Sequence, residues 1–206
     1  MSSHAHLETQ PLPAEPERAT LEGRNKITGF WLFLAGETTL FGTLFATYIA
    51  LRNQTLSGPT ANELFDFELV ALATFILLVS SLFSVLAVNA MHKHNVKALQ
   101  FWLFATVIFG LAFLVLEIYE FNHYTELGHT WSKSAFSSSF YALVGFHGAH
   151  VAFGLAWIAS VIGQLFKKGL TTVTAPKVYV SALYWHFIDV VWVFIFTVVY
   201  LMGKVG

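Results

Sequence analysis

The sequence contains no cysteine and few charged residues, and each absence excludes a class of site or of protein. Without cysteine the chain can form no disulfide, iron–sulfur cluster or thiolate-bound zinc or copper centre. Charged residues make up 11% of the chain, whereas soluble domains carry roughly 25%. A net charge of −1 offers no basic surface for nucleic acid. Hydrophobic residues fill 56% of the 206 positions, so the composition predicts a membrane protein.

Five apolar segments are long enough to cross a bilayer, which takes about 20 residues of helix. They run over about 27–51, 69–91, 99–121, 138–166 and 179–202. The connections between them hold the glycines, prolines and most charges, as turns do. We therefore predict an all-α membrane protein, a bundle of five transmembrane helices forming one domain over 27–206. Residues 1–26 are polar, contain three prolines, and are predicted to be a mobile cytoplasmic tail.

The distribution of lysine and arginine predicts the orientation, because these residues favour the cytoplasmic side. Eight flank the spans on the side of the N-terminus, namely Arg18, Arg24, Lys26, Lys93, Lys97, Lys167, Lys168 and Lys177. Three flank them on the other side, namely Arg52, Lys133 and Lys204. The N-terminus is therefore predicted to be cytoplasmic and the C-terminus outside.

Several ionisable residues fall at membrane depth, where each costs roughly 2.5–3.5 kcal/mol on insertion scales. Glu37, the His147/His150 pair and the His186/Asp189 pair lie about 10–18 Å into their spans at a rise of ~1.5 Å per residue. These three sets can meet if the first, fourth and fifth spans are neighbours, and they would then form an interhelical polar layer.

Two interpretations of this layer are open, interhelical hydrogen bonding and metal binding. Buried polar side chains in membrane proteins often join helices. His147 and His150 could offer two metal ligands, but a haem or copper site needs more imidazoles than this chain has at that depth, so no metal site is predicted. Glu37 has no basic partner on its own helix and is expected to keep its proton, which would make it a target for carbodiimides.

Other features lie at the helix faces and ends. Gly145 with Ala149 and Gly148 with Ala152 form small-residue pairs that should let another backbone approach the fourth span. Glu117 and Glu120 form an acidic motif near the outer end of the third span. Trp31 and Trp102 near the inner ends, and Tyr124, Trp131 and Tyr200 near the outer face, suit the aromatic belts of a membrane protein.

Four short motifs resemble those of one protein family. GFHGAHV at 145–151 and YWHFIDVVW at 184–192 are similar to two signatures of subunit III of the haem–copper respiratory oxidases. EIYE at 117–120 resembles a third segment, and FLAGE at 33–37 places Glu37 at the carboxyl of the family that reacts with dicyclohexylcarbodiimide. The resemblance runs from about residue 25 to residue 203. Because the longer forms have seven helices, this chain resembles the short bacterial form, most of all that of cytochrome c oxidases from Gram-positive bacilli.

The resemblance implies a non-redox accessory subunit of a proton-pumping complex that reduces oxygen to water in the bacterial plasma membrane. Haem and copper would lie in subunits I and II, and this chain would carry no catalytic centre. It would pack on subunit I, contact subunit II and a small subunit IV, bind phospholipid, and support proton uptake and oxygen access. It would also protect the active site from inactivation during turnover.

Three alternatives to this interpretation are open. Quinol oxidases carry a very similar subunit, so the electron donor is not determined by this sequence. From other classes, the polar residues at mid-membrane would suit a small proton-coupled transporter, although no paired repeat supports one. A membrane assembly factor is the third alternative. Co-purification with haem distinguishes an oxidase subunit from the last two.

Overall fold

The structure is a computed structural model, and it describes residues 12–55, 67–126 and 130–205. Five helices in it are long and apolar enough to cross a membrane. They are α1 (Leu21–Leu51), α3 (Phe67–His92), α4 (Val96–Glu126), α5 (Ala135–Lys168) and α6 (Ala175–Ile195). α6 continues as a π-helix, η3 (Phe196–Leu201), and then as α7 (Met202–Val205). None of the described residues forms a strand, and the prediction of a multi-pass, five-helix membrane protein is confirmed.

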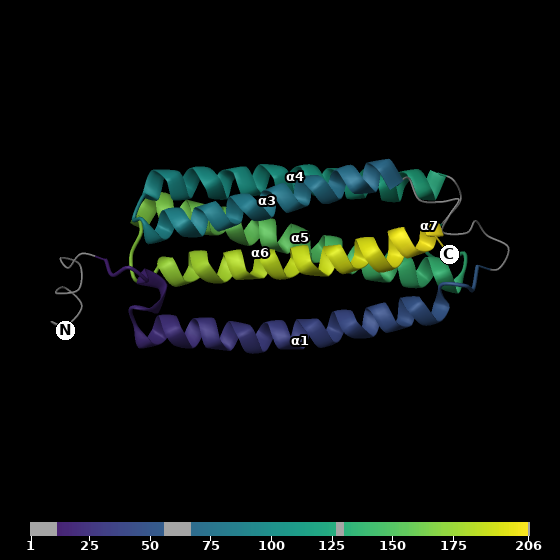
Figure 1. Ribbon diagram of the computed structural model, residues 1–206, viewed down its shortest axis with the longest axis horizontal. Coiled ribbons are helices and arrows are strands. Elements are labelled where there is room, and N and C mark those ends of the chain that lie inside the picture. Colours follow the sequence, from purple (N-terminus) through teal and green to yellow (C-terminus); the bar gives the residue numbers. More distant parts are fainter. Residues whose placement is uncertain (1–11, 56–66, 127–129, 206) are drawn as a thin grey trace.

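The helices lie side by side along the long axis of the molecule (Figure 1). α3 and α4 form a closely packed hairpin, while α6 contacts α1, α3 and α5. α5 also packs on α1 and α4, so α5 and α6 are the interior helices and α1 lies at one edge. α1 begins and α7 ends at opposite ends of the bundle (Figure 1), as an odd number of spans requires.

Local capping explains why the helices extend beyond the apolar runs. The Thr20 side chain accepts a hydrogen bond from the Gly23 amide at 3.0 Å and starts α1. Ser134 does the same for the Ser137 amide at 3.0 Å and starts α5. Gly169 ends α5 at φ 65°, a conformation that favours glycine. Such caps satisfy backbone groups at helix ends, so a helix can continue into the polar flanks.

The described segment before α1 lies against the end of the bundle. A 3₁₀ helix, η2 (Pro16–Arg18), packs on α1 and α6. Glu17 is buried there, and its Oε1 lies 3.2 Å from Nε2 of His92 at the end of α3. α1 also begins at Leu21, six residues before the apolar run that starts at Ile27. Polar side chains can therefore pack over the end of the bundle, and residues 1–11 of the predicted tail lie outside the described part.

Tryptophan side chains hold α6 to α3. The indole Nε1 of Trp185 donates to Ser80 Oγ at 3.0 Å, and that of Trp192 donates to Thr74 Oγ1 at 3.0 Å. Both rings are buried, and Gly110 of α4 leaves room for the first, since a Cβ there would lie 2.7 Å from the Trp185 ring. These contacts fix the rotation of α6, and therefore the direction in which its polar residues point.

Candidate functional site

Glu37 and His150 form a hydrogen-bonded pair between α1 and α5. Oε2 of Glu37 lies 3.1 Å from Nε2 of His150. The two side chains are 16% and 15% exposed, which places them at the edge of the bundle interior. The His150 ring also lies against Phe41, with ring centroids 5.1 Å apart.

The second nitrogen of His150 determines how this pair holds its proton. Nδ1 lies 2.8 Å from the carbonyl oxygen of Phe146. Since a carbonyl can only accept, Nδ1 carries a hydrogen. In a neutral imidazole Nε2 is then the acceptor, and Glu37 must be the protonated donor. If the proton moves to Nε2, the pair becomes a carboxylate and an imidazolium, so in both forms one proton is shared and the pair is neutral overall.

A small aromatic cavity opens beside this pair. It has a volume of about 260 Å³ and is lined by Phe33, Phe146, Ala149, His150, Phe153 and Tyr184. Five of these six residues carry aromatic or imidazole rings, so the cavity is a mostly apolar space next to His150, the partner of Glu37.

His147 lies apart from that pair, although it is only three residues away. Its ring is fully buried and stacks on Trp192, with centroids 5.1 Å apart. The Phe113 ring meets it edge-on at 6.1 Å. Neither ring nitrogen has a hydrogen-bond partner among the described residues. The predicted polar layer is therefore divided, with His150 toward α1 and His147 among α4 and α6.

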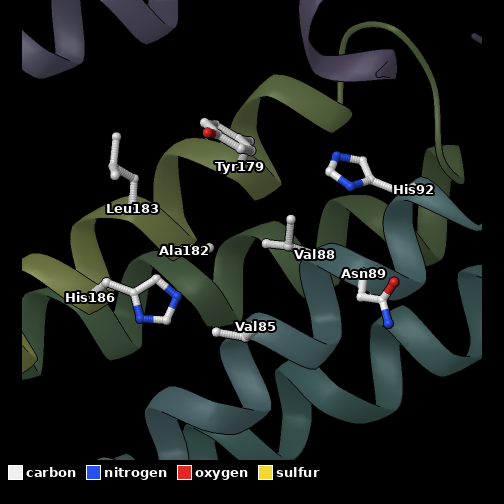
Figure 2. Close-up of a pocket in the computed structure, with 8 residues that line it drawn as sticks. All are labelled: Val85, Val88, Asn89, His92, Tyr179, Ala182, Leu183 and His186. Carbon is white, nitrogen blue, oxygen red and sulfur yellow. The ribbon is translucent and has the colours of Figure 1, made fainter. Parts of the chain in front are cut away.

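His186 and Asp189 lie on the α3 side of α6. Nδ1 of His186 is 2.9 Å from Ser81 Oγ and 3.9 Å from Asp189 Oδ2. His186 also lines a cavity of about 320 Å³ between α3 and α6. Figure 2 shows His186 at one end of this lining and His92 at the other, with Ala182 and Val88 between them. The bond between His186 and the Ser81 hydroxyl joins α6 to α3, and Ser81 was not among the predicted site residues.

Glu117 and Glu120 are buried between helices near the C-terminal end of α4. Glu120 accepts hydrogen bonds from the phenols of Tyr124 and Tyr200. Those two tyrosines are buried, so the prediction that they anchor the membrane interface is wrong. The Glu117 carboxyl packs on Gly148, where a Cβ would lie 2.8 Å from each oxygen. Gly148 therefore admits a side chain and not, as expected, another backbone.

No three His, Asp or Glu side chains in the described part come together in a way that could hold a metal ion. The predicted site residues instead lie apart, with Glu37 bonded to His150, His186 to Ser81 and Glu120 to Tyr200 across helix contacts, and His147 among aromatic rings. Sequence reasoning missed three hydroxyl residues of α3, namely Ser81, the partner of His186, and Thr74 and Ser80, the partners of Trp192 and Trp185. Their signal was weak, namely small hydroxyl residues spaced along one apolar span.

Comparison with known proteins relates the whole chain to one family. The family profile described as cytochrome c oxidase subunit III matches residues 19–204. Cytochrome c oxidase subunit 3 of Bacillus sp. (strain PS3) is 58% identical over 207 residues, covering 100% of both chains. The protein of the same name from Bacillus subtilis (strain 168) is 59% identical over 198 residues, covering 96% of each. Quinol oxidase subunit 3 of Bacillus subtilis (strain 168) is 46% identical over 203 residues, covering 98% of each.

Proposed function

The chain belongs to the cytochrome c oxidase subunit III family and is a subunit of a terminal oxidase complex, and from this premise we propose that it is the complex's non-redox accessory subunit. It packs on subunit I, contacts subunit II and a small subunit IV, and lies in the bacterial plasma membrane. Haem and copper are carried by the partner subunits, where oxygen is reduced and protons are pumped. The observation that carries this proposal is the full-length identity of 58% to a cytochrome c oxidase subunit 3.

The arrangement of buried polar groups supports an accessory role. Glu37 of α1 bonds to His150 of α5, and Ser81 of α3 bonds to His186 of α6, each across a helix contact. Such pairs hold helices together in a membrane, where the alternative is an unsatisfied polar group in hydrocarbon. The chain's own chemistry is therefore to orient helices and to hold protons at fixed positions.

Glu37 and His150 are the residues we propose to support proton uptake. Because the pair holds one shared proton and is neutral in both of its forms, it can lie at mid-membrane without a counter-ion. The aromatic cavity lined by His150, the hydrogen-bond partner of Glu37, supports the assignment of Glu37 as the carbodiimide-reactive carboxyl. Glu37 keeps its proton at rest in this proposal and donates a hydrogen bond to the imidazole of His150.

A second cavity supports the proposal that the subunit binds phospholipid. It lies between α1 and α6, has a volume of about 400 Å³, and is lined mostly by apolar side chains, namely Trp31, Leu34, Ala35, Thr38, Leu183, His186, Phe187 and Val190. The acyl chain of a phospholipid suits such a lining, because an apolar chain fits a cavity whose walls are mostly apolar side chains.

Co-purification tests the proposed function. A tagged form of this chain, extracted in mild detergent, should carry the haem absorbance of an oxidase through affinity and size-exclusion steps. A transporter or an assembly factor would purify without stoichiometric haem, and that result would overturn the proposal. A mixed-valence copper signal in the same sample distinguishes a cytochrome c oxidase from a quinol oxidase, which lacks that centre; the higher identity to the cytochrome c enzymes favours the former.

A further inference from the structure

Four polar side chains gather in the half of the bundle where α6 ends, away from the Glu37–His150 pair. Glu117, Glu120 and Tyr124 follow one another along one face of α4 at i, i+3 and i+7, a spacing that places them in successive turns. Tyr200 approaches from η3. The four are between 0% and 4% exposed, so the group is sealed from lipid and from water.

The hydrogen bonds of Glu120 match those of an ionised carboxylate. Tyr124 donates to its Oε1, and Tyr200 donates to its Oε2 at 3.3 Å. An ionised carboxylate accepts at both oxygens, and each phenol has one O–H to donate, so the two contacts suit that form. Two phenol donors on two different oxygens therefore stabilise the charged form.

The π-helix is what brings the second phenol to this carboxylate. η3 covers Phe196–Leu201 at the end of α6, and the Met202 amide bonds back to the Thr197 carbonyl, a span of five residues. A π turn holds more residues than an α turn, so it changes the direction of the side chains that follow it. π-helical turns of this kind occur often at functional sites, and this one carries Tyr200.

Glu117 has the opposite surroundings. Both of its oxygens are buried and have no hydrogen-bond partner among the described residues. The carboxyl instead packs on the Gly148 backbone of α5. A charge in such a place is costly, and the group takes its neutral form instead. The nearby Glu120 carboxylate, one turn along α4, further disfavours a second negative charge.

We propose that Glu117 and Glu120 together form a one-proton binding site, in which Glu117 holds the proton as a neutral acid and Glu120 is the carboxylate held by Tyr124 and Tyr200. The site lies in the half of the membrane where α6 ends. It shares no residue with the Glu37–His150 pair, and it does not depend on the role proposed for that pair.

Infrared difference spectroscopy on the purified complex tests this assignment, because the C=O stretch of a protonated carboxyl is separate from the bands of a carboxylate. When the spectrum of the Glu117→Gln complex is subtracted from that of the unaltered complex at neutral pH, one protonated-carboxyl band that shifts in D₂O should remain. Subtracting the spectrum of the Glu120→Gln complex in the same way should leave carboxylate bands instead. Glu126→Gln, at an exposed position of the same helix, is the matched control and should alter only carboxylate bands.

The proposal is overturned if Glu117→Gln leaves the protonated-carboxyl region unchanged, or if Glu120→Gln is the variant that removes a protonated band. Tyr200→Phe gives a second test that keeps both carboxyls in place. Losing one phenol donor should shift the carboxylate bands assigned to Glu120. If those bands do not move, or if the protonated band disappears instead, the assignment of the charge to Glu120 is wrong.

Discussion

Replacing Gly110 of α4 with alanine should destabilise the bundle by about 1–3 kcal/mol. The new methyl group would collide with the side chains of Leu155 on α5 and Trp185 on α6. A Cβ there would lie 2.7 Å from Leu155 Cδ2 and from Trp185 Cη2, about 0.8 Å inside ordinary carbon–carbon contact. Leu155 is flexible, but Trp185 is buried and bonded to Ser80 at 3.0 Å.

The magnitude follows from three contributions. Overpacking a filled core costs about 1–3 kcal/mol. Moving the indole also weakens the Trp185–Ser80 hydrogen bond, whose net contribution is about 0.5–1.5 kcal/mol. Against these, exchanging glycine for alanine inside a helix stabilises it by up to about 1 kcal/mol. The second and third contributions have similar size and opposite sign, so the net cost stays near the overpacking figure of about 1–3 kcal/mol.

The assay is the midpoint of heat-induced loss of this subunit from the purified complex. Gly163→Ala is the matched control, because a Cβ at Gly163 has no atom within 4 Å, and it should melt at or slightly above the unaltered protein. Adding Leu155→Ala to the Gly110 variant should restore little, since the Trp185 ring remains. If Gly110→Ala melts together with the control, the packing described around Trp185 is incorrect.

Three further changes test other parts of the account. Glu37→Gln should preserve assembly and most oxygen consumption while abolishing carbodiimide labelling at that position; complete loss of oxygen reduction would make Glu37 an obligatory proton conductor. A double-mutant cycle of Trp192→Phe with Thr74→Val should give a coupling of about 0.6–1.7 kcal/mol for the 3.0 Å bond, measured by thermal release of the subunit; a coupling of zero would contradict that contact. A protease-cleavable tag after Gly206, which lies outside the described residues, should be cut from the outer face of intact cells and protected in inverted vesicles; the reverse pattern would overturn the predicted orientation.

Hydrophobic length alone predicted the five spans, because no other structure satisfies backbone groups in lipid over such lengths. The first residues of α1 and α5 lie before the predicted starts of those spans, because capping by Thr20 and Ser134 extends both helices into polar sequence. The π-helix at the end of α6 was not predictable, because its residues are apolar and fit an α-helix equally well by composition.

The depth of the site residues was predictable but their direction was not. A rise of ~1.5 Å per residue places Glu37 and His150 at similar depth, and the structure brings them within 3.1 Å. His147, three residues from His150, lies at nearly the same depth, yet it faces Trp192 and Phe113. Which way a ring faces depends on the packing of three helices together, and one sequence contains no direct signal of that packing.

Removal of this subunit from the oxidase complex tests the central claim most directly. The account predicts that a complex without the chain keeps its haem spectrum and its initial rate of oxygen reduction, but inactivates after fewer turnovers. Loss of haem or copper together with this chain would contradict it, because a redox centre would then depend on ligands that the chain is proposed not to supply.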